Sequence, residues 1–482
     1  MAALTKSRYL SGLQCLKRLW IDEHAPERLA SASLGEQRII QQGMEVGQWA
    51  RELFPEGILV ESLDFRDAAK KTHELIHGGA GCIFEAAFQD GGLRVRCDVL
   101  VRQGDNSWKV VEVKSSTNVK EVQLPDLAFQ YHVLSKIGIP VEGLKIMHIN
   151  SGCVYPDLSD LFSFEDVTSQ VLALQEETAR NADTFITTLN QDSEPGIKIG
   201  RHCIKPGLCP AKETCWAGVP DYSIFTIPRL SEEKISDLVS SNCISLNDLP
   251  VDYPLSEKQR AYVKGVLDGE VKIDRKAVRE VISGYEYPIH FLDFETLDPA
   301  VPRFAGMRPY QQFPFQYSLH ILYENGTLKQ FEYLHMDKTD PRLPLLESLL
   351  DRFADHGAVV VYNAPFERGV LASLAEFLPR YASALNSITE RLKDQMDIFK
   401  YHYSHPGFLG KISLKNVLPV IVPSLSYESL NVSGGSDAQA VWDTMIRSTD
   451  MEEQKRMAED LKAYCALDTL AMVEIHSTLL EL

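Results

Sequence analysis

The chain has 482 residues, which is too long for a single hydrophobic core, so we expect two or three domains. Its 44% hydrophobic and 24% charged residues are ordinary for a folded protein and exclude a disordered or low-complexity chain. The formal net charge of −18 argues only weakly against a nucleic-acid ligand, because net charge governs solubility rather than what one cleft binds. Without a membrane-length apolar run or a signal-like N-terminus, we expect a soluble, cytoplasmic protein.

The first region, residues 1–225, is predicted to fold as a helix, a three-stranded meander, a helix and a strand, followed by a long helix. The expected elements are a helix at 36–53, strands at 82–88, 93–101 and 108–114, a helix at 126–136, a strand at 144–149 and a helix at 164–189. The first helix has an apolar stripe that should be buried, formed by Ile39, Ile40, Val46, Trp49 and Leu53.

Residues 226–285 are predicted to be a helical connector without a strand. Its apolar residues could close a small helical hairpin, and they are Leu230, Ile235, Leu238, Ile244, Leu246 and Leu249. This connector either contacts the backbone of DNA or serves as a packing spacer. The segment just before it is locally basic at Lys198, Arg201, His202 and Lys205, which fits a DNA-facing edge or an ordinary solvated loop.

The last region, residues 286–482, begins with three predicted strands at 289–294, 315–323 and 328–334. Asn325-Gly326 between the second and third strands is a strong signal for a hairpin turn. A helix at 343–353 and a buried strand at 358–362 follow. Three strands, a helix and a strand in this order are typical of the opening of a ribonuclease-H-like fold, so the expected fold class of the chain is α/β.

Carboxylates that could bind a divalent cation lie at three places in this last region. Asp293 and Glu295 are two residues apart in a central apolar strand, so both emerge on one face and need a compensating charge. Glu367 follows a buried strand, while Tyr464 and Asp468 share one face of a predicted helix. Oxygen ligands of this kind suit Mg²⁺ or Mn²⁺, two of which can cleave a phosphodiester with Tyr464 orienting the water.

These residues resemble the three motifs of the DEDD exonucleases of the DnaQ-like type. The matching segments are Asp293-x-Glu295, Asn363-Ala-x-Phe-Glu367 and Tyr464-x-x-x-Asp468. The tyrosine before the last aspartate resembles the DEDDy subgroup, which implies removal of nucleoside monophosphates from 3′ ends with two metal ions. Glu367 stands where that family usually has aspartate, and Asp397 is an alternative ligand.

A second set of charged residues falls on the predicted meander of the first region. Asp98 lies on its second strand, and Glu112 and Lys114 share one face of its third strand. The two carboxylates can bind a divalent metal, while the lysine can position a water or screen the charge of a phosphate. Gln130, on the next predicted helix, lies where its side chain could brace the site.

Asp98, Glu112-Val-Lys114 and Gln130 resemble the core of the PD-(D/E)XK nucleases, especially their RecB-like branch. The resemblance implies a restriction-endonuclease-like domain with a nuclease site in residues 1–225. Glu45 on the early helix is a further candidate ligand. Many RecB-like nucleases have a histidine near this position, where this chain has Gly47.

Nine cysteines should be reduced in a cytosolic chain, and three of them are evenly spaced as Cys203-x5-Cys209-x5-Cys215. Cys15 could supply a fourth thiolate. With one cysteine before the core and three after it, the arrangement resembles the iron–sulfur RecB-like nucleases and implies a [4Fe–4S] cluster, although the first gap is tighter there. Zinc is the alternative, but its sites favour gaps of two to four residues. The remaining cysteines should be packing residues, at positions Cys82, Cys97, Cys153, Cys243 and Cys465.

As a whole the chain resembles bacterial proteins in which an iron–sulfur RecB-like nuclease domain precedes a DnaQ-like domain. We therefore expect an enzyme that trims 3′ ends with its C-terminal site and cleaves or grips single-stranded DNA or DNA ends with its N-terminal site. Two alternatives stay open at this point. One is a DNA-end binding adaptor with an inert N-terminal site, and the other is an exonuclease that trims RNA.

Overall fold

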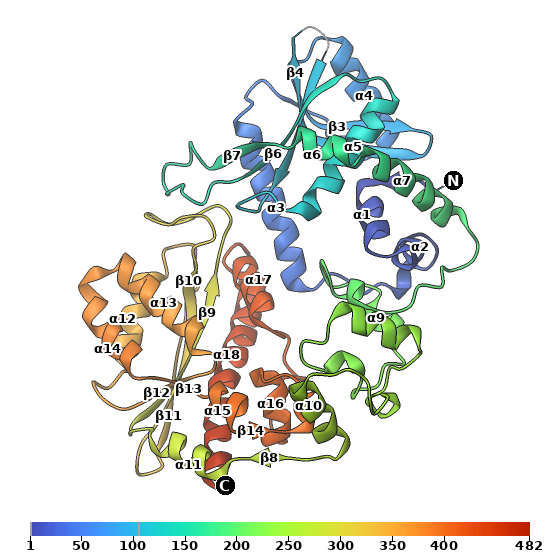
Figure 1. The fold of residues 1–482 in the computed structure, drawn as a ribbon. Helices are drawn as coiled ribbons and strands as arrows, with labels where there is room; N and C mark the ends of the chain where they lie inside the picture. Colours follow the sequence, from blue (N-terminus) through green and yellow to red (C-terminus); the bar gives the residue numbers. More distant parts are fainter. Residues whose placement is uncertain (1, 105–106) are drawn as a thin grey trace.

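The computed structural model describes residues 2–104 and 107–482, which form an α/β protein with two mixed β-sheets flanked by helices. Figure 1 shows the N-terminal sheet at the top of the view and the C-terminal sheet at the lower left, with residues 226–270 of the connector at the lower right and its last helix at the bottom beside the C-terminal sheet. No helix in the described part of the chain combines the length and the apolar character that a membrane span requires.

The N-terminal sheet is built around the meander that the sequence predicts. Its strands lie in the order β2-β3-β4-β5-β6-β7, and β1 pairs with β4 beside this path. The strands are β1 (Leu4–Thr5), β2 (Ile58–Leu59), β3 (Cys82–Asp90), β4 (Leu93–Gln103), β5 (Ser107–Lys114), β6 (Val141–Ile149) and β7 (Phe162–Asp166). Along β4, buried and half-exposed residues alternate, because alternate side chains of a strand point to opposite faces.

Helices pack on both faces of this sheet, and one of them reaches down to the C-terminal region (Figure 1). The helices of this region are α1 (Lys6–Gln14), α2 (Leu16–His24), α3 (Leu34–Glu52), α4 (Phe65–His77), α5 (Leu124–Lys136), α6 (Thr168–Ala173), α7 (Gln175–Asn190) and α8 (Lys212–Cys215). The serine at the N-terminus of α3 forms a capping box with Glu36, which explains why the helix begins there.

Two expectations for this region are wrong. The single helix expected over 164–189 is interrupted, because residues up to Asp166 pair with β6 as strand β7 and the helical part splits into α6 and α7. The apolar stripe of α3 is buried only in part: Val46 is inaccessible, but Ile39 and Ile40 are 61% and 59% exposed. Ile40 lines an open cavity beside β4 and β5, so this face of α3 has no protein packed against it.

The connector has a small hydrophobic core of its own, formed by the apolar residues that the sequence singles out together with neighbours such as Ile224 and Val263. Its helices are α9 (Glu232–Ser240), α10 (Glu257–Leu267) and α11 (Arg275–Ser283). The expectation of no strand is wrong, because β8 (Lys272–Ile273) pairs with β14 (Tyr403–Ser404) of the C-terminal region. The connector is therefore attached to that region by backbone pairing.

The C-terminal sheet has the strand order β11-β10-β9-β12-β13, with β9 in its centre. The strands are β9 (Ile289–Leu297), β10 (Phe313–Leu322), β11 (Leu328–Leu334), β12 (Val359–Val361) and β13 (Leu392–Asp394). β9 pairs antiparallel with β10 and parallel with β12. The hairpin predicted at Asn325-Gly326 is confirmed, and Gly326 has the positive φ of 81° that such a turn requires.

The two faces of this sheet are covered by different helices (Figure 1). These are α12 (Arg342–Leu350), α13 (Ala364–Phe377), α14 (Ala382–Glu390), α15 (Met396–Tyr401), α16 (Leu414–Ile421), α17 (Gly435–Met445) and α18 (Met451–Leu480). Leu292 and Phe294 of β9 pack with residues of α12, α13 and α14. Because side chains alternate along a strand, Asp293 and Glu295 face the opposite side, where α17 and α18 lie.

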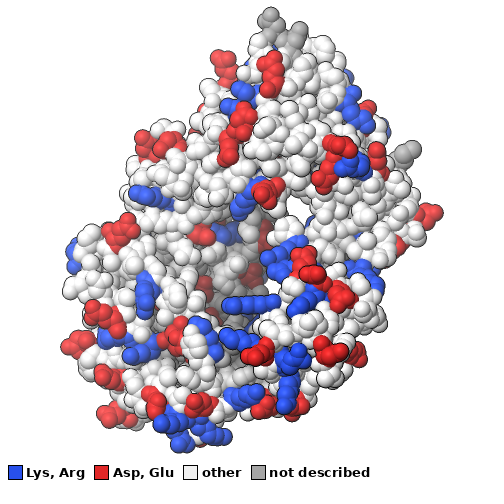
Figure 2. Space-filling view, viewed as in Figure 1, with Lys and Arg blue, Asp and Glu red and all other residues white. Residues whose placement is uncertain are grey.

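Charged side chains of both signs are scattered over the face drawn in Figure 2, in which a hollow opens near the centre of the molecule. The hollow lies between the C-terminal region and the segments that carry the cysteines and the connector (Figures 1 and 2). Lysine and arginine side chains stand along its rim (Figure 2).

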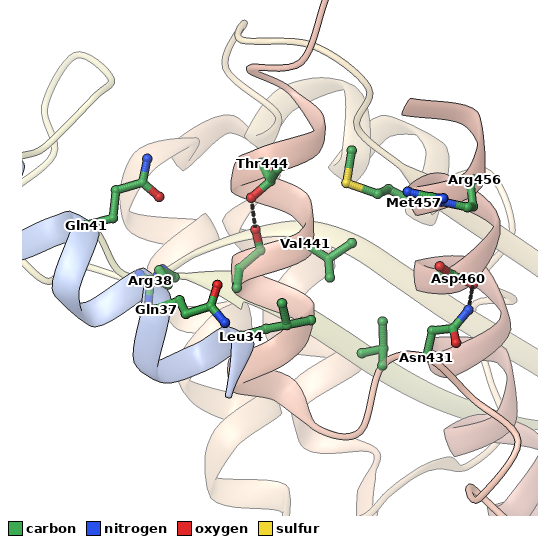
Figure 3. Close-up of a pocket in the computed structure, with 12 residues that line it drawn as sticks. Leu34, Gln37, Arg38, Gln41, Asn431, Val441, Thr444, Arg456, Met457 and Asp460 are labelled. Atoms are coloured by element: carbon green, nitrogen blue, oxygen red, sulfur yellow. Dashed lines mark hydrogen bonds between the residues drawn. The ribbon is translucent and has the colours of Figure 1, made fainter. Parts of the chain in front are cut away.

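The N-terminal and C-terminal regions also touch directly, mainly through α3 and α17. A Cβ at Gly35 would lie 2.7 Å from the Cβ of Ser436, so the two helices approach closely, and the Gly35 amide donates to Asp437 Oδ1 at 3.1 Å. Beside this contact is a cavity of about 440 Å³ between α3, α17 and α18 (Figure 3). The carboxylates singled out by the sequence do not line this cavity.

An apolar cluster joins the two regions next to this contact. Val46 of α3 and Ile149 of β6 pack with Ala300 and Val301, which follow β9. Residues from both sheets therefore share one buried cluster, and we expect the two regions to unfold together.

Val46→Asp tests this coupling, because it places a charge in the shared cluster. We expect a loss of about 3 kcal/mol in the free energy of unfolding, measured by urea titration of tryptophan fluorescence. Ile39→Asp, on the exposed face of the same helix, is the matched control and should change stability little. Equal midpoints for the two variants would contradict the shared cluster.

Candidate functional site

The C-terminal acidic residues meet where β9 runs beside α18. Asp293, Glu295 and Asp468 each place a carboxylate oxygen within 4.8 Å of the other two, and in the described part of the chain they are the one group of three or more such ligands this close together. We call these three residues the carboxylate triad. Asp293 and Glu295 come from β9, and Asp468 comes from α18 near the end of the chain. The packing of α18 on the sheet therefore assembles the group.

The triad is a concentration of negative charge with little water around it. Burial, and then the charges of Asp468 and Glu295, raise the pKa of Asp293 well above its usual range. Burial and the charge of Asp468 raise the pKa of Glu295 to about 8. Burial raises the pKa of Asp468 to about 6, although the hydroxyl of Tyr427 and the charge of Lys415 act in the opposite direction. Three such groups are costly unless protons or a cation neutralise them.

Four side chains surround the triad. Tyr427 donates a hydrogen bond to Asp468 Oδ1, and the thiol of Cys465 donates to Asp293 Oδ2 at 3.5 Å. The Lys415 ammonium lies 5.4 Å from the ring centre of Tyr427 and 5.1 Å from that of Tyr464. Burial raises the pKa of Tyr464, with the nearby carboxylates adding to the shift, so its hydroxyl keeps its proton at neutral pH.

Glu367 lies near the triad without joining it. It is buried in the first turn of α13, its charge contributes to the raised pKa of Asp293, and its Oε2 has no hydrogen-bond partner among the described residues. Burial raises the pKa of Glu367 to about 8. Asn363, just before it, adopts a positive φ of 87° where the strand turns into the helix. A buried carboxylate oxygen that has no partner in the described part of the chain, on a residue whose charge acts on Asp293, suits a further oxygen ligand for a cation.

Asp397, the alternative ligand, is not brought to the triad. It lies on α15 with its side chain about half exposed, 3.4 Å from the ammonium of Lys400. The neighbouring Asp394 instead accepts hydrogen bonds from the backbone amides of Asn363 and Ala364 and so fixes the start of α13. Of the two candidates, Glu367 and not Asp397 is close enough to the triad for its charge to act on Asp293.

The N-terminal set of charged residues is also brought together, on β4, β5 and α5. Glu112 Oε1 accepts from Lys114 at 2.7 Å, and Glu112 Oε2 accepts from Gln130 at 2.7 Å. Asp98 Oδ2 accepts from the backbone amide of Val113 at 2.8 Å. All four residues predicted from the sequence therefore meet around one buried carboxylate, and Gln130 braces it as expected.

Two further residues complete this N-terminal site, and the sequence reasoning missed both. The Lys6 ammonium lies 2.8 Å from Glu112, 3.5 Å from Asp126 and 3.9 Å from Asp98. Asp126 also accepts from Lys114 at 2.6 Å. Asp126 could have been found, because it lies four residues before Gln130 on the same helix face, whereas nothing local in the sequence links Lys6 to the meander.

Lys6 and Lys114 bring positive charge to the carboxylates of this site, so its pKa values differ from those of the triad. Burial alone would raise the pKa of Glu112, but the ammonium groups of Lys114 and Lys6 outweigh it and hold that pKa below its usual range. Burial and the charge of Glu112 raise the pKa of Asp98 to about 7. Glu112 is thus compensated by lysine, whereas burial and the charge of Glu112 leave the pKa of both Asp98 and Asp126 above their usual range.

The cavity beside the N-terminal site has a volume of about 550 Å³ and lies between the sheet and the exposed face of α3. Gly47 lines it, and a Cβ there would meet nothing within 4 Å, so this position does face the site. Glu45 does not: it points to the C-terminal region, 3.8 Å from Arg447. The expectation of Glu45 as a ligand is therefore wrong, because it lies on another face of α3.

The four cysteines expected to act together line one small cavity. Cys15, at the junction of α1 and α2, faces Cys203, Cys209 and Cys215 across it. Burial raises the pKa of the Cys15, Cys209 and Cys215 thiols, and each also responds to the charge of Cys203. Among the described residues, no three of these sulfur atoms lie within 4.8 Å of one another.

Comparisons with known proteins cover only parts of the chain. The family described as "Domain of unknown function (DUF2779)" matches residues 290–413, which include Asp293, Glu295 and Glu367. A protein of Mycoplasma pneumoniae named "Uncharacterized protein MG366 homolog" is 29% identical over 208 residues, covering 38% of this chain and 31% of that protein. "Uncharacterized protein UU173" of Ureaplasma parvum is 24% identical over 230 residues, covering 43% and 33%. The matches thus span about a third of the length of these relatives.

One solved structure, titled "Crystal structure of SSO0001", aligns with 45% of this chain and 87% of its own chain. The sequence identity is 13% and the TM-score is 0.22. A score this low carries no argument about fold or function.

Glu295→Gln tests whether the triad needs a cation. The pKa of Glu295 is about 8 in the folded protein and near 4.5 when unfolded, so the metal-free wild type loses stability as the pH rises from about 4.5 to about 8. Glutamine removes this repulsion, and we expect the variant in EDTA at pH 8 to melt a few degrees higher than the wild type, by about 2–4 °C. It should lose most of the stabilisation by Mn²⁺ that the wild type shows.

Differential scanning fluorimetry in EDTA and in Mn²⁺ measures both the melting temperature of the metal-free protein and its increase when Mn²⁺ is added. Asp397→Asn, which removes a carboxylate outside the triad, is the control and should keep the Mn²⁺ response. A variant Glu295→Gln that melts lower in EDTA and still responds fully to Mn²⁺ would show that the triad does not bind the ion.

Proposed function

We propose that this protein is a metal-dependent nuclease whose C-terminal triad removes nucleotides from the 3′ ends of single-stranded DNA. The observation that carries the proposal is the triad, in which three carboxylates with raised pKa values converge while the charge of Lys415 offsets their repulsion only in part. The strand order β11-β10-β9-β12-β13, with β9 central, supports a ribonuclease-H-like domain of the DnaQ type. Both features agree with the resemblance of the three motifs to the DEDDy exonucleases.

In this proposal the carboxylates of the site bind cations, and the neighbouring tyrosine and lysine orient the reactants. Asp293, Glu295 and Asp468 supply oxygen ligands suited to Mg²⁺ or Mn²⁺, and Glu367 extends the set toward a second ion. Bound ions of this kind activate a water and stabilise the leaving oxygen of a phosphodiester. The protonated hydroxyl of Tyr464 would orient that water, and Lys415 would add positive charge beside it.

For the N-terminal region we propose a RecB-like PD-(D/E)XK site built from Asp98, Glu112, Lys114 and Gln130. The hydrogen bonds among Glu112, Lys114 and Gln130 support this arrangement. One observation favours the alternative, an inert site in a module that grips DNA ends. Lys6 already neutralises Glu112 from the side of the cavity, so this site depends less on a metal than the triad does.

The four cysteines fit an iron–sulfur cluster better than zinc. With Zn–S bonds of about 2.3 Å, four thiolates around one zinc ion lie about 3.8 Å apart. Among the described residues, no three of the sulfur atoms of Cys15, Cys203, Cys209 and Cys215 lie within 4.8 Å of one another, although all four residues line one small cavity. A [4Fe–4S] cubane holds its thiolates further apart than a single ion does, and it would join α1 and α2 to the segment that precedes the connector.

The central prediction concerns 3′ trimming. Asp293→Asn combined with Glu295→Gln removes two ligands of the triad, and we expect Mn²⁺-dependent release of nucleotides from a 5′-labelled single strand to fall about a thousandfold or more. Asp397→Asn should retain activity, and Lys114→Ala should leave 3′ trimming unchanged because it belongs to the other site. Undiminished trimming by the double variant would place the activity elsewhere in the protein. A parallel RNA strand separates the DNA and RNA alternatives.

The cysteine assignment predicts the metal content of the protein. After anaerobic purification we expect about four iron and four sulfide per chain, with visible absorption that bleaches on reduction. Cys209→Ser should lose most of the iron, whereas Cys243→Ser, a buried cysteine of the connector core, should retain it. One zinc per chain without sulfide would contradict the cluster.

A further inference from the structure

A cavity of about 620 Å³ lies between the cysteine segment, the connector and the C-terminal region. Arg201 and Lys212 line it from the cysteine segment, Arg229 lines it from the connector, and Lys411 and Asn416 line it from the C-terminal region. We call it the connector cavity. None of the residues of the triad or of the N-terminal site lines it.

The connector cavity gathers positive charge in an acidic protein. Arg201, Lys212, Arg229 and Lys411 line it, against one carboxylate, that of Asp221. Within residues 2–104 and 107–482, no carboxylate lies within 4.0 Å of any of these four cationic groups, although the chain carries an excess of 18 acidic residues. Four unpaired cations around one hollow indicate an anionic ligand.

The same cavity offers aromatic and apolar surface beside these charges. The rings of Trp216 and Phe225 lie 4.3 Å apart between their centres, and Ile204 and Leu230 are also part of the lining. The indole Nε1 of Trp216 is buried and has no hydrogen-bond partner in the described part of the protein. The Lys212 ammonium also lies 4.9 Å from the ring centre of Trp216, so cationic and aromatic groups share one wall of the cavity.

One short segment connects the connector cavity to the triad. Lys411 and Asn416 line the cavity, and Lys415, between them, lies over the rings of Tyr427 and Tyr464 and lowers the pKa of Asp468. This segment is held firmly against the connector. Gly410 has a φ of +72°, and a Cβ there would lie 2.6 Å from the backbone oxygen of Thr226. The cavity and the triad are therefore on two sides of one fixed segment.

We infer that the connector cavity binds a single-stranded polynucleotide and directs its 3′ end to the triad. The four cations would contact successive phosphates, and the Trp216–Phe225 wall would contact bases, the combination by which proteins hold single strands without reading their sequence. The binding follows from the cavity itself, whereas the direction of the 3′ end rests on the proposed nuclease function of the triad.

The test is binding of a fluorescent oligothymidylate of about 16 nucleotides, followed by anisotropy in EDTA so that no cleavage occurs. The cavity variant combines Arg201→Gln, Arg229→Gln and Lys411→Gln. The matched control combines three exposed cations on α4, far from the cavity, namely Arg66→Gln, Lys70→Gln and Lys71→Gln. Equal melting temperatures of the two variants establish that both are folded.

We expect the cavity variant to raise the Kd about tenfold or more and to reduce the slope of log Kd against log salt by about 2, since each lost phosphate contact removes about 0.7 from the slope. The control variant should bind like the wild type. Equal binding by both variants, or tighter binding of a blunt duplex than of the single strand by the wild type, would overturn the inference.

A small substrate separates this inference from the proposed reaction. The p-nitrophenyl ester of thymidine 5′-monophosphate is too short to span the cavity, so the cavity variant should hydrolyse it with Mn²⁺ at the wild-type rate while degrading the oligonucleotide more slowly. If the wild type hydrolyses neither compound but binding still depends on the three cations, the nuclease function fails and the cavity assignment stands. Loss of ester hydrolysis in the cavity variant would overturn the assignment, because the cations would then act in catalysis.

Discussion

Repulsion among buried carboxylates is the constraint on which the C-terminal region depends. β9 is covered on both faces, so Glu295 is buried and Asp293 is only partly exposed, and α18 adds the buried Asp468 to the same point. Tyr427, Cys465 and Lys415 relieve this repulsion only in part, since the pKa of each member of the triad still lies above its usual range. Such an arrangement is unfavourable for stability alone and becomes favourable when divalent cations bind.

In the N-terminal site, the repulsion among buried carboxylates is compensated by lysine side chains. Its carboxylates are arranged around two ammonium groups, from Lys6 and Lys114, so that Glu112 is ionised and paired within the protein itself. A site of this kind can hold its shape without a metal, whereas the triad cannot do so at the same cost. The contrast explains why we place the cleavage of phosphodiesters first in the C-terminal region and keep DNA gripping as an alternative for the N-terminal one.

The periodic features of the chain could be predicted from its sequence. Alternation along β4 and β5, the Asn325-Gly326 turn and the two-residue spacing of Asp293 and Glu295 are local, and the elements formed where these patterns indicate. Such local patterns gave wrong predictions where contacts between distant segments determine whether a residue is buried or which element it joins. Ile39 and Ile40 are exposed because nothing packs on that face of α3, and residues 162–166 became a strand because β6 offered a free edge.

The members of the sites that were missed come from distant segments. Lys6, Lys415 and Tyr427 approach their sites only through the packing of α1, α16 and the loop before α17, and no spacing in the sequence links them to the carboxylates. Asp126 is different, because its four-residue spacing from Gln130 was visible in the sequence. The cysteine group could be predicted because three of its members are evenly spaced, although the inclusion of Cys15 rested on a resemblance.

The most direct test of the central claim is a crystal structure of the wild-type protein soaked with Mn²⁺, with anomalous diffraction recorded to locate the metal. We expect anomalous peaks bounded by the carboxylates of Asp293, Glu295 and Asp468, with Glu367 on the side of a second ion. A crystal in which manganese binds at other carboxylates but leaves the triad without a peak would contradict the account.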